Sequence, residues 1–467
     1  RIHKMLSEIG LIGLGVMGKN IGLNISEKGT NIKAYNASTE KLDSIKKEFG
    51  TNFSGYTTLK ELVENIARPR NILLMIPSGE PTHNIINQLS DLLDEGDVII
   101  DGGNSFYQES INHGNSLAEK KINFVGMGVS GGEEGARNGP AIMVGSNKNL
   151  DENLIDLLSS ISAKAADACI GFYEGFGSGH FVKMVHNGIE YAEMQLIAES
   201  YFLLKKSGYT NLEIADFFDS LKILNQSSYL IEITSEILRK KEGEKFIIDL
   251  IKPSANNKGT GRLTVETALD LGITAPSIFA AYDARVQSNA GDYWKLDEKL
   301  FKQDNTVGPQ GSEKTEIFNL VARSLYFGRI SSMIQGLTII WSYNEVNKFS
   351  FNFVDIFKNW SGGCIIRSEM LDELIKIDDT SEDFLQSEEL HSLLKVNLDA
   401  VKNLVRDALS KDIALPVFSS SLNWYLNLSS SDNPSNLIQA QRDFFGSHTV
   451  QLLSSDEYIH IDWRKDE

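Results

Sequence analysis

Four side chains that could carry out acid–base chemistry stand close together in residues 177–191, which read G-S-G-H-F-V-K-M-V-H-N-G-I-E-Y. If this segment is a helix, Lys183, His186, Asn187 and Glu190 occupy positions i, i+3, i+4 and i+7 and share one face. A lysine and a glutamate can act as base and acid when their surroundings bring their pKa values towards neutrality. The same spacing is also typical of a solvated helix face with paired charges, so the segment alone leaves both interpretations open.

The rest of this predicted helix is suited to packing. Val182, Val185 and Ile189 lie on a different face from the four polar side chains, and such an apolar face can be buried against a core. The preceding residues 171–179 contain four glycines and predict a loop at a domain boundary. We expect the helix to follow this loop and to continue to about Lys206.

The composition is typical of a soluble globular protein, with 41% apolar and 23% charged residues in a chain of 467, which is long enough for two or three domains. The net charge of −18 argues against nucleic acid or an anionic membrane as the main partner. Residues 1–6 are not followed by the apolar run of a secretory signal, so a cytoplasmic protein is expected. Cys169 and Cys364 are expected to be buried free thiols, and no metal is predicted.

The N-terminal residues have the pattern of a β-α-β unit. An apolar strand is predicted at residues 8–14, a helix follows up to Lys28, and a second strand is predicted at residues 31–36. Between the first strand and the helix stands G-L-G-V-M-G, whose glycines permit a tight turn, close approach of a pyrophosphate and close helix–strand packing. The predicted dinucleotide contacts are Gly13, Leu14, Gly15, Val16, Met17 and Gly18.

The residues after the second strand should contact the adenosine ribose of a bound dinucleotide. An acidic residue there is typical of NAD enzymes and a nearby arginine of NADP enzymes, but Asn36, Ala37 and Ser38 match neither. Small polar groups, with help from Lys41, could accept a 2′-phosphate. These residues leave the choice of cofactor open.

More strands alternate with helical patterns and predict a doubly wound parallel sheet, in which ligands lie beyond the carboxyl ends of the strands. Asn104 and Ser130 lie in loops after two of these strands and are candidate ligand contacts, although such residues are also common in ordinary turns. The further strands are predicted at residues 71–76, 97–101, 122–125 and, as the last of the sheet, 141–145.

From Gly179 onwards the pattern is mostly helical. A polar loop is expected at residues 301–312. Besides the helix described above, helices are predicted at residues 211–224, 228–241, 264–271, 277–290, 313–344, 353–358, 390–407 and 416–426.

Basic residues in this helical half could bind an anion. Lys258 opens the run K-G-T-G-R, which could hold a phosphate through backbone N–H groups and the lysine, or could be a basic surface turn. Arg285 lies on a predicted helix. Arg442 and His448 stand six residues apart in a tail whose apolar side chains predict packing onto another surface, such as a second subunit.

Eight motifs, in the same order along nearly the whole chain, resemble the decarboxylating 6-phosphogluconate dehydrogenases of the oxidative pentose phosphate pathway. The helix and tail motifs are highly specific, whereas the glycine fingerprint alone indicates only a dinucleotide-binding fold. The motifs are I-G-L-G-V-M-G (12–18), D-G-G-N-S (101–105), G-V-S-G-G-E-E-G-A-R (128–137), G-H-F-V-K-M-V-H-N-G-I-E-Y (179–191), S-Y-L-I-E-I-T (228–234), K-G-T-G (258–261), G-G-C-I-I-R-S (362–368) and N-L-I-Q-A-Q-R-D-F-F-G-S-H-T (436–449).

The resemblance implies a Rossmann-like domain over residues 1–177, a large all-helical substrate and dimerisation domain over residues 178–435, and a tail over residues 436–467 that reaches the partner subunit of a homodimer. It implies oxidation and decarboxylation of 6-phosphogluconate to ribulose 5-phosphate and CO2, with reduction of NADP. Neither nucleic acid nor a membrane is expected as a partner.

The resemblance also assigns roles to individual residues. Lys183 matches the general base and Glu190 the general acid. The matching substrate contacts are Asn104, Ser130, Gly131, Gly132, His186, Asn187, Tyr191, Lys258, Thr260 and Arg285, together with Arg442 and His448 from the tail of the neighbouring subunit. The matching cofactor contacts, besides the glycine fingerprint, are Asn36, Ala37, Ser38, Ile76, Pro77, Ser78 and Asn104.

The sequence departs from the family at the nucleotide end. Residues 36–38 read N-A-S where the family reads N-R-T, and residues 76–78 read I-P-S where the family reads V-K-A. Residues 258–263 read K-G-T-G-R-L in place of K-G-T-G-K-W. NADP is therefore expected from the resemblance alone, and a preference for NAD remains an alternative.

Two other functions stay open at this point. A catalytically weak homologue could act as a sugar-phosphate binding or regulatory protein, but the intact pair of Lys183 and Glu190 argues against it, because binding alone requires no acid–base pair. A β-hydroxyacid dehydrogenase with a smaller substrate is disfavoured by Lys258, Arg285 and Arg442, since a small acid would not need three cations beyond its own carboxylate.

Overall fold

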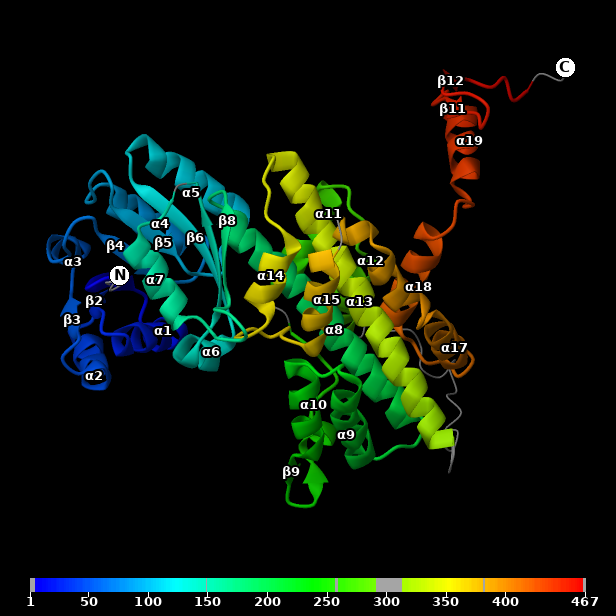
Figure 1. Cartoon of the computed structure of the whole chain (residues 1–467), viewed down its shortest axis with the longest axis horizontal. Coiled ribbons are helices and arrows are strands. Elements are labelled where there is room, and N and C mark those ends of the chain that lie inside the picture. The colour runs from blue at the N-terminus through cyan, green and yellow to red at the C-terminus, as the bar shows by residue number, and fades with distance from the viewer. Residues whose placement is uncertain (1–4, 148, 257–258, 291–312, 381–382, 465–467) are drawn as a thin grey trace.

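The computed structural model describes residues 5–147, 149–256, 259–290, 313–380 and 383–464. An α/β unit contains the N-terminal part of the chain, a helical unit follows, and the last segment projects from the helical unit (Figure 1). The predicted combination of a Rossmann-like domain and a large helical domain is therefore confirmed. Lys258 and the polar loop predicted at residues 301–312 lie outside the described residues.

One sheet of eight strands has the order β3-β2-β1-β4-β5-β6-β7-β8. The order reverses beside β1, so the glycine-rich turn that follows β1 lies at the switch point where such sheets bind ligands. The strands are β1 (Glu8–Ile12), β2 (Asn31–Tyr35), β3 (Phe53–Tyr56), β4 (Asn71–Leu74), β5 (Val98–Asp101), β6 (Asn123–Ser130), β7 (Ala141–Ser146) and β8 (Ile170–Glu174).

Helices cover both faces of this sheet. Leu73 of β4 is buried in the core formed with α1, α2 and α7, whereas Ile72 and Leu74 are buried in the core formed with α3, α4 and α5. This alternation along a single strand makes the domain doubly wound. The helices are α1 (Val16–Glu27), α2 (Thr39–Phe49), α3 (Leu59–Glu64), α4 (Glu80–Ser90), α5 (Tyr107–Glu119), α6 (Gly132–Asn138) and α7 (Glu152–Ile161).

Three details of the predicted sheet are wrong. The strand predicted at residues 122–125 continues to Ser130, so Ser130 ends a strand instead of lying in a loop. The strand at 141–145 runs antiparallel to β6, and β8 follows it within the segment predicted as a glycine-rich loop. The glycines at both ends of that segment hide its alternation, in which Tyr173 is buried and Phe172 is exposed.

The helical unit is built on two long helices, α8 (Ser178–Lys206) and α13 (Glu313–Asn347), which pack against each other (Figure 1). A Cβ atom at Gly336 would lie 2.5 Å from the side chain of Ile189, so the two helices are in close contact. Val182, Val185 and Ile189 are fully buried, as predicted. The shorter helices are α9 (Asn211–Ser220), α10 (Tyr229–Arg239), α11 (Thr260–Asp270), α12 (Pro276–Ser288), α14 (Phe353–Trp360), α15 (Glu369–Thr380), α16 (Glu388–Lys395), α17 (Leu398–Leu409), α18 (Pro416–Leu428) and α19 (Ser435–Gly446).

Several predicted helices differ in their bounds. The helix predicted at 390–407 is divided into α16 and α17, because the chain turns at Val396 and Asn397. The helix predicted at 264–271 begins at Thr260, so residues 259–261 form a helix start and not only a loop. Helices α15 and α19 were not predicted, nor were the two-stranded pairs β9 (Lys241–Glu242) with β10 (Lys245–Phe246) and β11 (Val450–Gln451) with β12 (Tyr458–Ile459). Among the described residues, no helix is both long and apolar enough to span a membrane.

The first turn of α8 lies directly on the sheet. A Cβ atom at Gly179 would lie 2.3 Å from the carbonyl oxygens of Gly126 and Met143, so only glycine permits this approach. One turn later, a Cβ at Gly128 would lie 2.6 Å from the Cβ of Lys183. The glycines of α8 and β6 therefore determine how close α8 lies to the sheet, and so fix the position of the Lys183 Cβ beside β6.

Candidate active site

One face of α8, largely buried, brings the four predicted polar side chains together. Lys183 Nζ donates a hydrogen bond of 2.5 Å to Asn187 Oδ1. His186 Nδ1 lies 3.3 Å from the same oxygen and 3.8 Å from Glu190 Oε2. The amine, imidazole, amide and carboxyl groups thus form one connected cluster, as the helical spacing predicts.

Burial shifts the ionisation of this cluster. Desolvation lowers the pKa of the Lys183 ammonium, although the nearby Glu190 carboxylate opposes the shift. Desolvation raises the pKa of Glu190, opposed by Lys183 and Arg285. The pKa of His186 lies well below its usual value because the ring is fully buried and Lys183 is close. The two pKa shifts run towards the neutral amine and the protonated carboxyl group, which are the forms required of a base and an acid.

The turn after β6 forms one wall of the cluster. Ser130 Oγ lies 3.4 Å from His186 Nε2. Gly131 and Gly132 both have positive φ angles, of 112° and 62°, and a Cβ at Gly131 would lie 2.4 Å from the carbonyl oxygen of Gly363. The side chain of Cys364 is buried. The motif at 362–368 therefore packs on the predicted substrate-binding turn, a role that its sequence did not reveal.

A second wall comes from α11 and α12. The guanidinium carbon of Arg285 lies 3.5 Å from the centre of the Tyr191 ring, and a Cβ at Gly261 would lie 2.5 Å from Cδ2 and Cε2 of this ring. Thr260 begins α11 after Gly259, whose φ of 83° provides the turn. Tyr191, Thr260 and Arg285 are thus held around the same end of the cluster, and Lys258 lies outside the described residues.

The glycine-rich turn fits the pyrophosphate of a dinucleotide. A Cβ at Gly18 would lie 1.8 Å from the carbonyl oxygen of Gly13, whereas one at Gly15 would meet nothing within 4 Å. No side chain caps α1, whose N-cap residue is Gly15, so its first N–H groups are not used by a capping side chain. A Cβ at Gly13 would lie 2.8 Å from the side chain of Ile76, which places the loop after β4 beside this turn.

The adenosine end is less well equipped for a 2′-phosphate. Ala37 and Ser38 are exposed after β2. Two N–H donors near this position are already engaged, because Ser38 N–H bonds to Asn36 Oδ1 at 2.9 Å and Lys41 N–H bonds to Ser38 Oγ at 3.3 Å. These two backbone N–H groups are thus used within the turn itself, and residue 37 provides no arginine that could bind a 2′-phosphate.

Comparison with known proteins decides the family. The model of the NAD binding domain of 6-phosphogluconate dehydrogenase matches residues 8–171, and the model of the C-terminal domain of 6-phosphogluconate dehydrogenase matches residues 179–463. The chain belongs to the 6-phosphogluconate dehydrogenase family. It is 38% identical to the decarboxylating enzyme of Lactococcus lactis over 98% of both chains, and 38% identical to that of Staphylococcus aureus over 98% of this chain and 99% of the relative.

A solved structure supports the same assignment. The 6-phosphogluconate dehydrogenase of Plasmodium falciparum matches with a TM-score of 0.92 and 36% identity, over 98% of this chain and all of that one. That protein was solved in its apo form, with its cofactor NADP+ and with its substrate 6-phosphogluconate. The decarboxylating, NADP-dependent oxidoreductase class expected from the motifs is thus confirmed at the level of the family.

His180 was not singled out by sequence, although it lies within the family's helix motif. Its ring is buried at the start of α8, with Nε2 3.0 Å from the carbonyl oxygen of Gly103 and Nδ1 2.7 Å from Ser110 Oγ. Burial lowers the pKa of His180 and so favours the neutral ring. Because a carbonyl oxygen only accepts, Nε2 carries the proton of that neutral ring and Nδ1 accepts from the serine. His180 therefore ties α8 to the loop that presents the exposed Asn104.

Asp101 fixes the same loop from the sheet. Its fully buried carboxylate accepts hydrogen bonds from Gly103 N–H at 3.0 Å and from Ser105 Oγ at 2.5 Å. Asn104 is therefore held between two buried polar anchors, one on β5 and one on α8.

The two substrate contacts predicted in the tail do not lie near the cluster on α8. Arg442 and His448 lie on and just after α19, which projects away from the body of the chain that carries α8 (Figure 1). The structure does not bring them to the site of their own chain. Among the described residues, no group of three or more His, Cys, Asp and Glu side chains is placed to hold a metal ion.

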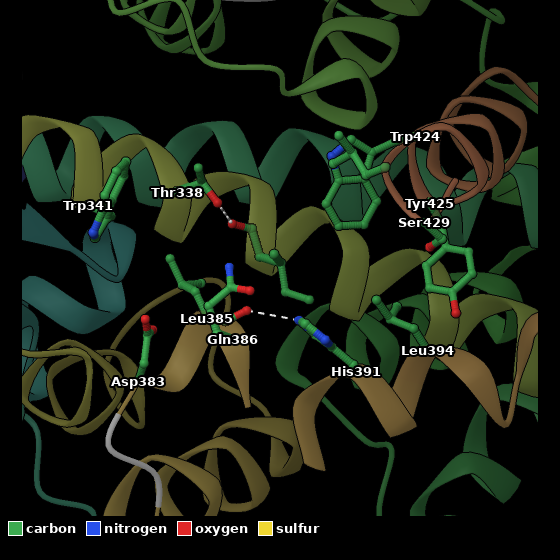
Figure 2. Close-up of a pocket in the computed structure, with 12 residues that line it drawn as sticks. Thr338, Trp341, Asp383, Leu385, Gln386, His391, Leu394, Trp424, Tyr425 and Ser429 are labelled. Atoms are coloured by element: carbon green, nitrogen blue, oxygen red, sulfur yellow. Dashed lines mark hydrogen bonds between the residues drawn. The ribbon is translucent and has the colours of Figure 1, made fainter. Parts of the chain in front are cut away.

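A separate pocket of about 560 Å³ lies in the helical unit, between α13, α16 and α18 (Figure 2). It is lined by Trp341, Trp424 and Tyr425 and by His391, whose Nε2 bonds to the carbonyl oxygen of Leu385 at 2.9 Å. None of the predicted substrate or cofactor residues lines this pocket. Its walls are mainly apolar and aromatic, which does not suit a sugar phosphate.

Proposed function

We propose that this chain oxidises and decarboxylates 6-phosphogluconate to ribulose 5-phosphate and CO2, with Lys183 as general base and Glu190 as general acid. The observation that carries this proposal is the shared face of α8, where burial lowers the pKa of the amine and raises that of the carboxyl group. A protein that only binds sugar phosphates would gain nothing from holding both groups in these forms.

The substrate would bind with its phosphate towards α11 and α12. Thr260 and the guanidinium of Arg285 would hold the phosphate, together with Lys258, because cations and N–H groups at a helix start suit an anion. Ser130 and Asn187 would then face the carboxylate and hydroxyl groups at the other end. The remaining proposed contacts are Asn104, Gly131, Gly132, His186 and Tyr191.

The acid–base steps follow from this orientation. Neutral Lys183 removes the proton of the 3-hydroxyl group, and a bound nicotinamide supplies the acceptor for the hydride that leaves C3. In the resulting 3-keto acid, the Lys183 ammonium stabilises the negative charge that develops on the carbonyl oxygen as the C1–C2 bond breaks and CO2 leaves. Glu190 then gives a proton to the former C2, which becomes C1 of ribulose 5-phosphate.

Labelled substrate tests these steps. With 6-phosphogluconate deuterated at C3 and carbon-labelled at C1, the deuterium should appear in the reduced nicotinamide and the carbon label in CO2, in equal amounts. Deuterium transfer without release of labelled CO2 would show an oxidation that stops at the keto acid, and the proposed decarboxylation would be wrong.

The proposed cofactor is NADP, with weak discrimination against NAD because Ala37 and Pro77 stand where the family carries basic residues. Ala37→Arg should raise the NADP-over-NAD ratio of kcat/KM by roughly 10- to 100-fold, since an arginine–phosphate hydrogen bond contributes about 1.5–3 kcal/mol. Ala37→Gln, of similar length but uncharged, is the control and should change the ratio little. An unchanged ratio in Ala37→Arg would mean that residue 37 does not face the 2′-phosphate.

We also propose a homodimer in which each tail completes the neighbouring site. Arg442 and His448 lie far from their own α8, and the tail exposes large apolar side chains, with Leu437 62%, Phe444 51% and Phe445 74% exposed. Such side chains are expected to be covered in the assembled protein. In this arrangement Arg442 and His448 would reach the phosphate end of the partner's site.

His180 provides a test of how the catalytic helix positions the loop with Asn104. His180→Leu leaves the Gly103 carbonyl and the Ser110 hydroxyl without their partner and should lower kcat by roughly 10- to 100-fold, because misplacement of reacting groups is costly. His180→Gln can keep a donor to Gly103 and should retain most of the activity. Equal losses of kcat in both variants, at unchanged melting temperature, would contradict this positioning role.

A further inference from the structure

The tail is organised around a carboxylate. Asp443 is the one residue of α19 that is buried, and its side chain is fully covered although the neighbouring Phe444 and Phe445 are exposed. Four donors surround it: Thr449 N–H (2.8 Å) and His460 Nδ1 (2.9 Å) on Oδ1, and Ile461 N–H (3.0 Å) and Trp463 Nε1 (2.9 Å) on Oδ2.

These four hydrogen bonds use the full acceptor capacity of a carboxylate. They also hold the open end of the β11–β12 pair, where β11 begins and β12 ends, against α19, and a two-stranded pair of this size is not stable alone. Burial by itself would raise the pKa of Asp443, but the donors from His460, Ile461 and Trp463 outweigh it and hold the pKa below its usual value. Hydrogen bonds to Asp443 thus hold this small unit together, as an apolar core would in a larger one.

The backbone around His448 depends on the same residue. Ser447 and Thr449, on either side of His448, have φ angles of 52° and 63°, in the left-handed region that non-glycine residues rarely adopt. Thr449 is β-branched, for which this conformation is particularly unfavourable. Ser447 N–H bonds to the Asp443 carbonyl oxygen at 2.9 Å, and Thr449 N–H bonds to its carboxylate. Asp443 therefore holds both ends of the strained turn that presents His448.

Arg442 is linked to this turn through one side chain. Arg442 Nη1 donates to Gln439 Oε1 at 3.0 Å, and Gln439 Nε2 donates to the Thr449 carbonyl oxygen at 2.6 Å. Gln439 Nε2 also lies 3.4 Å from the His448 carbonyl oxygen, so the Arg442 guanidinium and the backbone that carries His448 belong to one hydrogen-bonded unit within the tail.

We propose that Asp443 is a positioning residue that assembles the tail before it docks, so that Arg442 and His448 enter the site of a second copy of this chain as a fixed pair. This inference rests on the proposed tail exchange. Because the tail is already ordered, substrate binding in the partner's site does not have to supply the free energy of ordering it.

The proposal predicts a selective loss of substrate binding. Asp443→Ala should raise the KM for 6-phosphogluconate about 10- to 100-fold, as expected for lost hydrogen bonds to a charged group, and should leave the KM for NADP unchanged within about 2-fold. Asp443→Asn keeps part of the acceptor capacity and should fall between the wild type and Asp443→Ala. Asp456→Asn removes an exposed carboxylate of the same tail and should have no effect. A parallel rise in the KM for NADP would overturn the proposal.

Heterodimers show in which subunit Asp443 acts. Differently tagged subunits, one Asp443→Ala and the other Lys183→Met, are co-expressed and the heterodimer is purified. It should have about half of the wild-type activity, because one site combines an intact body with an intact tail. The Arg442→Ala heterodimer with Lys183→Met should behave in the same way.

The two heterodimers separate two failures. Suppose that the Arg442→Ala heterodimer is active and the Asp443→Ala heterodimer is not. Asp443 would then be needed for the active site of its own subunit and not for that of the partner, which would overturn this proposal alone. Inactivity of the Arg442→Ala heterodimer, with both parent homodimers inactive, would overturn the tail exchange and this proposal with it.

Discussion

Lys183→Met should lower kcat for 6-phosphogluconate oxidation by roughly 10⁴-fold, because it removes both the base for the 3-hydroxyl proton and the cation that stabilises the developing oxyanion. Methionine has a similar length and suits a buried position, so the helix should remain folded. Binding of 6-phosphogluconate, measured by calorimetry, should remain detectable, because the residues proposed to hold the phosphate, including Arg285, lie on other elements.

Lys183→Arg is the matched control, since it keeps the positive charge but cannot be deprotonated. It should lose oxidation as Lys183→Met does, yet still accelerate decarboxylation of a supplied 3-keto acid, which needs the cation and not the base. Turnover near the wild-type rate in Lys183→Met would show that another group is the base. Oxidation by Lys183→Arg would lead to the same conclusion.

Glu190→Gln should lower steady-state kcat by roughly 10²- to 10³-fold, because an amide cannot supply the proton that completes the enol-to-ketone step. Hydride transfer does not require this proton, so the variant should still reduce nicotinamide once. Rapid mixing should therefore show a burst of reduced cofactor close to one per site, followed by slow turnover.

A glutamine at position 190 keeps the side-chain volume and the contact with His186. The variant therefore distinguishes loss of the donated proton from loss of packing. Glu190→Asp, which keeps an acid on a shorter side chain, should recover part of the steady-state rate. A Glu190→Gln enzyme that turns over like the wild type without a burst would remove Glu190 from the mechanism. Loss of both the burst and steady-state turnover would show that Glu190 is needed at or before hydride transfer.

The parts of the site that lie on one element could be predicted from the sequence. The i, i+3, i+4, i+7 spacing of Lys183, His186, Asn187 and Glu190 depends only on helical geometry, and the structure places them in one cluster. The glycine fingerprint was predictable for the same reason, because the turn, the close approach and the packing are all local requirements.

Contacts between distant segments could not be predicted in this way. His180 meets Gly103 and Ser110, which precede it by 77 and 70 residues, and nothing in the spacing of these residues indicates that they meet. The same holds for Gly363, whose carbonyl oxygen lies against Gly131. Asp443 reads in the sequence as one acidic residue in a charged tail, and its role depends on a backbone that folds back over it.

The errors in secondary structure have a related origin. The glycines of residues 171–179 predict a loop, but in β8 pairing with the neighbouring strand β7 overrides this local preference. The glycines around Ser130 predict a loop, but antiparallel pairing of residues 126–130 with β7 extends the strand β6 to Ser130.

The most direct test of the proposed function is nicotinamide absorbance after the purified protein is mixed with 6-phosphogluconate, once with NADP and once with NAD. We expect reduction of the cofactor accompanied by release of CO2, with NADP as the better substrate by a modest margin because Ala37 offers no charge to the 2′-phosphate. A folded protein that binds 6-phosphogluconate but reduces neither cofactor would contradict it, and would identify the chain as a sugar-phosphate binding protein on an enzyme's fold.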